Sequence, residues 1–278
     1  MTRLRQPAQH QNERDDASGI HDRVSAQFGA AAAAYTTSPV HADPDALRRV
    51  VELAKPGSTD RALDIATGAG HTALALAPHV AHVVAYDMTE PMLRETARNA
   101  AARGLSNVAT QQGIAESLPF AAATFDIVTA RQAPHHFADV RAALREMARV
   151  AKSGARIVVV DSTSPDDASL ARQWNHIEKL RDPSHVRNYT PTEWREMIAA
   201  AGLRVTFEEP GFATENGRPM DFAAWVGRMK TPPDVVDELT RLFRAASPEL
   251  VAALRIEIAP DNAILFCVPL VTLAATKA

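Results

Sequence analysis

The residues with the clearest chemical potential are two aspartates that flank a glycine turn. Asp64 lies in a short apolar run, and Gly68 and Gly70 follow it before a helical pattern begins at Thr72. Asp87 ends the next apolar run along the chain. Glycines let the backbone approach a ligand closely, and a helix start offers unpaired N–H groups. At the carboxyl edge of parallel strands, such a turn binds nucleotide-like ligands, so we expect a cofactor site there.

A second set of residues could move a proton. The candidates for a general base are His135, His136, Asp161, His176 and His185. His136 follows the fourth expected strand and Asp161 ends the fifth, so both are expected at the ligand-binding edge of the sheet. His185 and Arg187 belong to the loop 181–187 and are expected to line a substrate pocket. The alternatives are structural roles for His136 and Asp161, and a salt-bridged staple for the loop.

The elements that must position these residues alternate regularly. Strands are expected at 62–66, 82–86, 108–112, 126–130 and 155–161, and helices at 72–77, 91–103 and 140–151. Strands separated by helices indicate right-handed βαβ units and a parallel sheet covered on both faces. The fold class predicted is therefore α/β. Helices at 166–181 and 192–201, a strand at 203–208 and a last strand at 263–273 follow.

Outside this alternation, the sequence predicts three further segments. Residues 1–19 are expected to be a disordered leader, and 20–278 a single domain. Within that domain, 20–56 is expected to form a helical lid and 211–256 a helical insertion before the last strand. The insertion carries Phe212, Phe222, Trp225 and Met229, which could line an apolar pocket, form a dimer face or belong to the core.

Composition excludes several classes of protein. The chain has 30 basic and 33 acidic residues, a net charge of −3, which argues against a nucleic-acid binder. Cys267 is the only cysteine, so neither an internal disulfide nor a thiolate cluster for a metal can form. The apolar run 263–275 is shorter than the roughly 20 residues that span a bilayer, so no membrane span is expected. Without a secretory signal at the start, a cytoplasmic location is expected. No metal is expected.

Two interpretations compete at the glycine turn. The segment Gly68-Ala-Gly-His-Thr-Ala73 fits the dinucleotide fingerprint G-x-G-x-x-G/A, and Asp87 stands 19 residues beyond Gly68. On this pattern alone, the protein would be an NAD(P)-binding oxidoreductase whose acidic residue holds ribose hydroxyls.

Further motifs at fixed places favour the second interpretation. They are Leu63-Asp-Ile-Ala-Thr-Gly-Ala-Gly70, Val84-Ala-Tyr-Asp-Met-Thr-Glu-Pro-Met-Leu93, Gly113-Ile-Ala-Glu-Ser-Leu-Pro-Phe120, Phe125-Asp-Ile-Val128 and Leu144-Arg-Glu-Met-Ala-Arg-Val150 with Gly154. With them the chain resembles the class I S-adenosylmethionine (SAM)-dependent methyltransferases over about residues 20–210. It is most similar to the small-molecule enzymes of ubiquinone and menaquinone biosynthesis. The resemblance implies a Rossmann-like, doubly wound, seven-stranded and mostly parallel sheet with an antiparallel last strand.

The resemblance also implies SAM as the cofactor and assigns residues to it. Asp64 would orient the turn and the ammonium group, the backbone from Ala66 to Gly70 would take the methionine end, and Asp87 the ribose hydroxyls. Tyr35 would reach the SAM carboxylate or close the pocket, or simply pack on the sheet. The alternative role of Asp64 and Asp87 is to cap the following helices. The complete set is Tyr35, Asp64, Ala66, Thr67, Gly68, Gly70, Asp87, Met88, Ile114, Ala115 and Arg131, in which Met88, Ile114 and Ala115 would wall the adenine.

Two departures from the family pattern stand out. Ala66 replaces the usual first glycine, which is tolerable if its φ stays negative. Ile114 replaces an aspartate that reads the adenine amino group. The expected activity is methyl transfer to carbon or oxygen of a small, apolar or aromatic acceptor, with His136, Asp161 and His185 as catalytic candidates. A SAM-binding protein without catalysis stays an alternative, and the chain could be a monomer or a homodimer.

Overall fold

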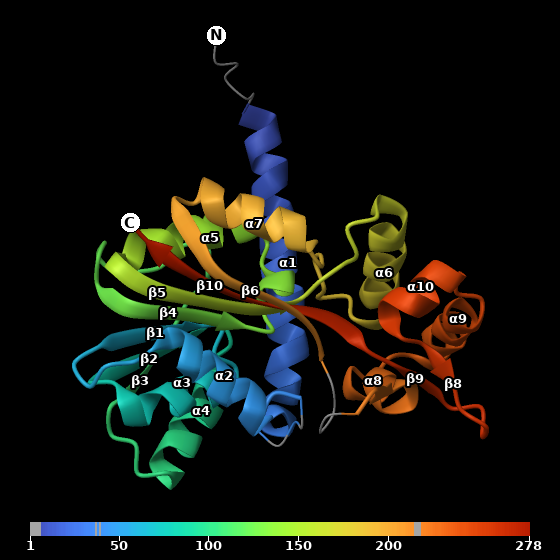
Figure 1. The fold of residues 1–278 in the computed structure, drawn as a ribbon, viewed down its shortest axis with the longest axis horizontal. Coiled ribbons are helices and arrows are strands. Elements are labelled where there is room, and N and C mark those ends of the chain that lie inside the picture. The colour runs from blue at the N-terminus through green and yellow to red at the C-terminus, as the bar shows by residue number, and fades with distance from the viewer. Residues whose placement is uncertain (1–6, 37, 39, 214–217) are drawn as a thin grey trace.

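A sheet of seven strands organises the protein (Figure 1). The computed structural model describes residues 7–36, 38, 40–213 and 218–278. The strand order is β3-β2-β1-β4-β5-β10-β6, the first five strands run parallel, and β10 is antiparallel to both its neighbours. The strands are β1 (Arg61–Ile65), β2 (His82–Asp87), β3 (Val108–Gln112), β4 (Phe125–Arg131), β5 (Ala151–Ser162), β6 (Leu203–Ala213) and β10 (Val268–Lys277). The predicted Rossmann-like α/β fold is confirmed.

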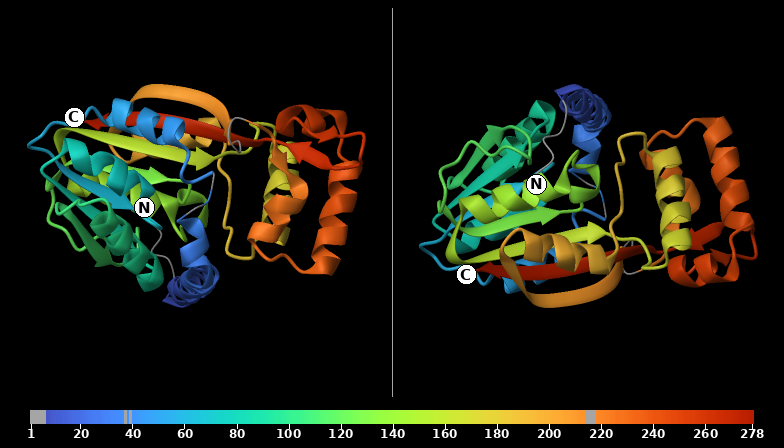
Figure 2. Two further views of the ribbon diagram at one scale, coloured as in Figure 1. Left: turned by 90° about the horizontal axis from the view of Figure 1, so that it is seen from below. Right: turned by 90° about the horizontal axis from the view of Figure 1, so that it is seen from above.

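Helices cover both faces of the sheet, as parallel crossovers require (Figures 1 and 2). On one face lie α2 (Pro44–Ala54), α3 (His71–Leu76), followed by the short turn η1 (Ala77–His79), and α4 (Glu90–Ala102); on the other lie α5 (Val140–Val150) and α7 (Pro191–Ala200). Capping side chains mark the residues at which two of these helices begin. Asp43 accepts hydrogen bonds from two N–H groups of α2, and Thr190 with Glu193 forms a capping box on α7.

Both faces of the sheet are packed with apolar side chains. Leu144, Met147 and Trp194 from α5 and α7 fill one face, and Val50 and Leu76 from α2 and α3 fill the other. Because the central strands are buried on both sides, their sequences are almost continuously apolar. This burial holds the carboxyl ends of the strands in fixed relative positions.

A second group of elements lies beside the sheet and is here called the helical lobe (Figures 1 and 2). It comprises α6 (Ala168–Arg181), α8 (Phe222–Arg228), α9 (Pro233–Arg244), α10 (Pro248–Leu254) and the small sheet of β7 (Met220–Asp221), β8 (Glu257–Ile258) and β9 (Ile264–Phe266). Its core is aromatic: the Trp225 ring lies 5.1 Å from that of Phe266 and 5.8 Å from that of Phe243.

The lobe differs from the predicted insertion in two ways. The expected last strand 263–273 is two strands, β9 and β10, which separate at Cys267 and belong to different sheets. In addition, α6, which precedes the insertion in sequence, packs with it through Trp174. Strands of two or three residues are too short to show an alternating pattern, so sequence periodicity could not reveal the small sheet.

The N-terminal region also differs from expectation. A single helix, α1, runs from Pro7 to Tyr35, so residues 7–19 of the expected disordered leader are helical. Residues 1–6 lie outside the described part. Of the expected lid 20–56, only α1 and the segment after it reach the cavities described below, whereas α2 packs on the sheet. Within the described residues, no helix has the length and apolar content needed to cross a membrane.

Candidate functional site

The carboxyl ends of β1, β2, β4 and β5 meet at one edge of the sheet, where two adjoining cavities lie. The first, here called the first cavity, lies against the turn that follows β1. The predicted cofactor residues that line it are Tyr35, Asp64, Ala66, Thr67, Gly68, Asp87, Met88, Ile114, Ala115 and Arg131. Gly70 is the exception. It starts α3 and packs against α4, where a Cβ atom would lie 2.8 Å from Thr96 Cγ2.

Asp64 organises the turn that follows β1. It is 1 % exposed and accepts hydrogen bonds from Thr67 Oγ1 at 2.6 Å, Thr129 Oγ1 at 2.7 Å and the Ala73 N–H at 3.1 Å. Burial raises the pKa of Asp64 to about 6 even though these donors act against the rise. The carboxylate therefore ties β1, the turn, α3 and β4 together, and its bond from the Ala73 N–H in the first turn of α3 is the capping role given as the alternative. Contact with the ammonium group of SAM stays a prediction.

The turn corrects the expectation for Ala66. Its φ is +52°, in the left-handed region, close to the +56° of Gly68. The Thr67 N–H donates to the Tyr86 carbonyl at 3.0 Å, and this bond to β2 fixes the course of the backbone after Ala66. An L-residue with a Cβ atom in this region is strained by about 1–2 kcal/mol, so Ala66 occupies a position suited to glycine.

Ala66→Gly is expected to raise the free energy of unfolding by about 0.5–1 kcal/mol. Relief of backbone strain exceeds the extra entropy that glycine adds to the unfolded chain. Urea unfolding measures the change. The matched variant Gly68→Ala should lower stability by a similar amount, since its Cβ atom would meet no atom within 4 Å and only the backbone is affected. A loss of stability in Ala66→Gly would contradict the strain.

Asp87 joins the turn to the start of α4. Its Oδ2 accepts the Gly68 N–H and its Oδ1 the Thr89 N–H, each at 2.8 Å. Burial raises the pKa of this carboxyl. Thr89 is the N-cap residue of α4, so Asp87 also has the capping role given as the alternative. Each carboxylate oxygen retains a further lone pair, and the residue lines the cavity, so it can also accept two ribose hydroxyls.

Asp87→Ala is expected to weaken SAM binding by about 1.5–3 kcal/mol, or about 10–150-fold, because charged hydrogen bonds to the ribose are lost. Isothermal titration calorimetry measures the dissociation constant. Asp126→Ala is the control, since Asp126 pairs with Lys152 and with the Arg61 N–H at the opposite end of the sheet. An unchanged affinity in Asp87→Ala would remove this residue from the ribose.

The end of the cavity expected to hold adenine is rigid. The Tyr86 hydroxyl donates to the Ile114 carbonyl at 3.1 Å, and a Cβ atom on Gly113 would lie 1.9 Å from that hydroxyl oxygen. Only glycine fits there. Although Ile114 replaces the usual aspartate, the carboxylate of Glu116 also lines the cavity. Glu116 accepts the Ala138 N–H at 2.8 Å.

The opposite end suits the amino-acid part of SAM. Arg131 ends β4, and its Nε donates to Thr72 Oγ1 at 3.1 Å while Nη2 donates to the His41 carbonyl. Its buried Nη1 has no hydrogen-bond partner among the described residues, so it can donate to a carboxylate. Burial lowers the pKa of Arg131 to about 10, with Asp64 opposing, so it stays charged near neutral pH. A Cβ atom added to Gly68 would meet no atom within 4 Å, so there is open space beside the backbone of the turn. This space and the unpaired donor of Arg131 fit the amino-acid end of SAM.

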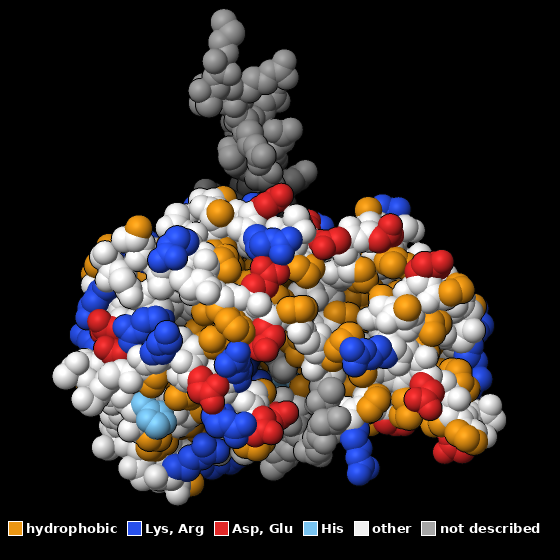
Figure 3. Space-filling model, in the orientation of Figure 1, with side chains coloured by type: hydrophobic (Ala, Val, Ile, Leu, Met, Phe, Trp, Pro, Cys, Tyr) orange, Lys and Arg blue, Asp and Glu red, His pale blue; other side chains and the backbone are white. Residues whose placement is uncertain are grey.

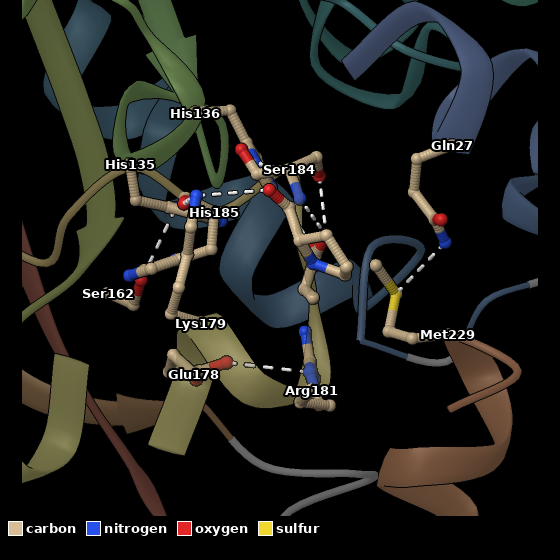
Figure 4. Close-up of polar contacts among 12 residues, drawn as sticks. Gln27, His135, His136, Ser162, Glu178, Lys179, Arg181, Ser184, His185 and Met229 are labelled. Atoms are coloured by element: carbon tan, nitrogen blue, oxygen red, sulfur yellow. Dashed lines mark hydrogen bonds and ion pairs between the residues drawn. The ribbon is translucent and has the colours of Figure 1, made fainter. Parts of the chain in front are cut away.

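The second cavity lies between the sheet edge and the helical lobe. Its apolar wall includes Trp225 and Met229, two of the four insertion residues predicted for a pocket. Phe222 instead belongs to the lobe core, and Phe212 lies under the Arg255 guanidinium. The cavity shares five lining residues with the first, namely Phe28, Tyr35, His41, Gln132 and His136. Gln27 of α1 reaches Met229 Sδ at 3.8 Å and joins α1 to the lobe (Figure 4).

His135 and Asp161 form a buried pair at the second cavity. His135 lies on the short turn η2 (Pro134–His136), and its Nδ1 is 2.6 Å from Asp161 Oδ1 at the end of β5. Burial acts against charge on His135, but the charge and hydrogen bond of Asp161 outweigh it and raise the pKa of the imidazole. Asp161 itself is 0 % exposed. Because Nδ1 donates to the carboxylate, Nε2 carries the free lone pair.

The other two catalytic candidates have different surroundings. His136 lies in the wall shared by both cavities, and burial followed by the charge of His135 lowers its pKa to about 3, so it is neutral. His185 lines neither cavity. It is buried and its Nε2 contacts Asn175 Oδ1 at 3.2 Å. The geometry gives His185 a structural place rather than the expected pocket position.

The loop 181–187 holds the two histidines of η2. The N–H groups of Val186 and Arg187 donate to the His135 carbonyl at 2.9 and 3.1 Å. His136 Nδ1 lies 3.1 Å from the Ser184 carbonyl (Figure 4). The Arg187 side chain pairs with Glu193 at 2.6 Å, away from both cavities. The staple alternative is therefore the better description of Arg187.

Sequence reasoning did not single out several cavity residues. The acidic and basic ones at the second cavity are Glu178, Arg181, Asp182 and Arg228. Arg181 and Asp182 belong to or adjoin the loop 181–187, part of which was expected to line a substrate pocket. Glu178 and Arg228 belong to no sequence motif. Among the described residues, no group of three or more His, Cys, Asp or Glu side chains could hold a metal ion.

Comparison with known proteins agrees with this geometry. A methyltransferase-domain family matches residues 63–159. The uncharacterized methyltransferase YcgJ of Bacillus subtilis is 39 % identical over 222 residues, covering 80 % of this chain and 86 % of that protein. The crystal structure of YcgJ matches with a TM-score of 0.77 and 36 % identity, covering 84 % of this chain and 98 % of that one. The demethylmenaquinone methyltransferase of Thermus thermophilus is 42 % identical over 181 residues, covering 58 % of this chain and 82 % of that protein.

These relatives decide between the two interpretations of the glycine turn. The oxidoreductase alternative rested on one short fingerprint, whereas the methyltransferase relatives match most of the chain. The cofactor is SAM. The chain belongs to the class I SAM-dependent methyltransferases, and it resembles the type that includes the demethylmenaquinone methyltransferases.

Proposed function

We propose that the enzyme methylates a small apolar or aromatic acceptor that carries a hydroxyl group, bound in the second cavity, with His135 as the general base. The single observation that carries the proposal is the His135–Asp161 pair beside a cavity that adjoins the cofactor cavity. The apolar wall, with Trp225 and Met229, suits a ring or hydrocarbon group. The Thermus thermophilus relative is named for methylating demethylmenaquinone, which supports a small acceptor.

SAM supplies an electrophilic methyl group on a sulfonium sulfur, which departs as a neutral thioether. His135 Nε2 accepts the hydroxyl proton of the acceptor, and Asp161 stabilises the imidazolium that results. The resulting oxyanion, or a ring carbon conjugated with it, would take the methyl group that SAM supplies, and if a ring carbon takes it, the hydrogen on that carbon would leave as a proton and the oxygen would regain one. The proton then passes from His135 to water.

The other residues align and enclose the reactants. His136 is neutral and stands in the shared wall, where it borders both cavities without competing for the proton. Phe28 packs edge-on against His136 with ring centroids 4.8 Å apart and helps to exclude water. Asp161 acts through His135 and is a positioning residue. A cytoplasmic location, a homodimer and the lack of a nucleic-acid partner stay predictions from the sequence.

On the face shown in Figure 3, Lys and Arg side chains are interspersed with Asp and Glu rather than gathered in one patch. A mixed surface of this kind supports a small-molecule acceptor over a polyanion.

The test is methyl transfer to a metabolite pool. The full chain is incubated with SAM labelled at the methyl group and with a small-molecule cell extract, and products are separated and identified by mass spectrometry. We expect label in a small hydroxylated compound or its methyl ether. Absence of label from every small molecule, or label only on macromolecules, would overturn the proposal.

A further inference from the structure

The helix α1 closes one end of the first cavity. It crosses the carboxyl edge of the sheet (Figure 1), and His21, Val24 and Phe28, which share one face of the helix, line this cavity. His21 meets Glu116, which follows β3, with Nε2 of the histidine 3.5 Å from Oε2 of the glutamate. A residue near the start of the chain therefore stands at the cofactor site, opposite the loop after β3.

Glu116 is held in one orientation by the chain after η2. Its Oε1 accepts the Ala138 N–H at 2.8 Å and the Asp139 N–H at 3.3 Å, and its side chain is 13 % exposed. The other oxygen, Oε2, faces His21 Nε2, and this buried nitrogen makes no hydrogen bond within the described part of the chain. Holding the two N–H groups takes one carboxylate oxygen, so Oε2 keeps a lone pair for a ligand in the cavity.

The strand order decides which part of SAM reaches Glu116. The ends of β4, β1, β2 and β3 follow one another along the edge of the sheet, so Arg131, Asp64, Asp87 and Glu116 lie in this spatial order. With the amino-acid end of SAM at Arg131 and the ribose at Asp87, the base lies at the loop after β3. The donor that adenine presents there is its exocyclic amino group.

Two backbone acceptors at this end of the cavity are already engaged. The Ile114 carbonyl accepts the Tyr86 hydroxyl at 3.1 Å and the Ser117 N–H at 3.3 Å. The Met88 carbonyl accepts Gln112 Nε2 at 2.9 Å. An amino group that enters a cavity without an acceptor is unfavourable. The free carboxylate oxygen in the same wall supplies that acceptor, and its charge makes the hydrogen bond stronger than one to a carbonyl.

We propose that Glu116 Oε2 accepts a hydrogen of the adenine amino group of SAM, and that His21 on α1 holds this oxygen in place and covers the contact. Glu116 is then a specificity-determining residue, and His21 is a positioning residue that acts through it. A site built to bind a donor rejects an analogue that lacks it, because the buried acceptor loses its partner. The inference concerns the cofactor alone, so its failure would leave the proposed acceptor function standing.

The test compares two ligands that differ at the base. S-Inosylhomocysteine is S-adenosylhomocysteine with an oxygen in place of the amino group, so an acceptor replaces the donor that would face Glu116. Each ligand is titrated into the full chain by isothermal calorimetry. We expect S-adenosylhomocysteine to bind at least about tenfold more tightly, the effect of one charged hydrogen bond. Equal affinity for the two ligands would overturn the inference.

Glu116→Gln reverses the polarity of the contact. Its amide oxygen would stay at the N–H groups of Ala138 and Asp139, so the amide nitrogen would face the base. We expect S-adenosylhomocysteine to bind at least about tenfold more weakly, while S-inosylhomocysteine binds as tightly as before or more tightly. A residue that only holds the turn would weaken both ligands equally or neither, and either result would overturn the inference.

His21→Phe tests the positioning residue without touching the N–H groups that Glu116 holds. The preference for S-adenosylhomocysteine should fall by about two- to fivefold, the size of a partly exposed ion pair. An unchanged preference would overturn the inference, and this variant decides it if Glu116→Gln does not fold.

Glu146→Gln and His79→Phe are the matched controls. Glu146 also accepts a loop N–H, that of Leu118 at 2.8 Å, and His79 is exposed on η1. Neither residue lines the first or the second cavity, so both variants should keep the preference of the natural protein. A preference that falls as far in these controls as in Glu116→Gln would also contradict the inference.

Discussion

His135→Gln is expected to lower the rate of methyl transfer by about 10²–10⁴-fold with SAM affinity unchanged, because a positioned general base is lost. Glutamine keeps a polar group near Asp161 but cannot accept the proton. The rate is measured in a single turnover with the acceptor identified by methyl labelling. His176→Gln is the matched control, since His176 is exposed on α6 and lines neither cavity.

The pH dependence of the same rate adds a second readout. His135 must be neutral to accept a proton, and Asp161 raises its pKa above the ordinary value near 6.5. The rate should therefore rise with pH, and the midpoint of this rise should lie above pH 6.5. Asp161→Asn should lower the rate and shift this midpoint to lower pH. A midpoint at the same pH in both proteins would contradict the pairing, as would an unchanged rate in His135→Gln.

Asp64→Ala is expected to lower the free energy of unfolding by about 2–4 kcal/mol. The change leaves the hydroxyls of Thr67 and Thr129 and the N–H of Ala73 without their shared acceptor, and buried donors without partners are strongly unfavourable. Urea unfolding without cofactor measures the loss. Asp126→Ala, which breaks a partly exposed ion pair with Lys152, should cost under about 1 kcal/mol.

The sign of the pH effect at Asp64 can be checked with Asp64→Asn. The folded protein holds the pKa of Asp64 at about 6, above the ordinary 3.8, so it binds more protons than the unfolded chain between these values. The stabilising contribution of the carboxyl is then complete below about pH 4 and is lost as pH rises through 6. The stability of the natural protein relative to Asp64→Asn should fall across that window. A rise would contradict the raised pKa.

The sequence predicted most of the residues that line the first cavity because they belong to local patterns. The turn after Asp64 and the aspartate at the end of the next strand are short-range patterns, and the sheet brings their strands together by a known connection. The backbone at Ala66 was beyond reach, since its positive φ follows from the Thr67 bond to Tyr86 across two strands. The identity of residue 66 alone does not reveal such a contact between distant segments.

The acceptor side was less predictable because it depends on contacts between distant segments. His135 and His136 are neighbours, and only the pairing with Asp161, 26 positions further on, distinguishes their roles. His185 stands in the loop that carries the pair, but its own ring turns to Asn175. Arg228 lies at the second cavity because α8 packs into the aromatic core of the lobe. No periodic pattern in the sequence predicts that core.

The place where the lobe joins the sheet bears on how such enzymes diversify. Ala213 at the end of β6 is directly paired with Val268 at the start of β10, so the chain leaves and re-enters the sheet at neighbouring backbone positions. A short hairpin could close the same gap without altering the register of either strand. The segment between them could therefore change in length or sequence, and with it the part of the second cavity that Trp225 and Met229 line, without moving the strands that line the first cavity.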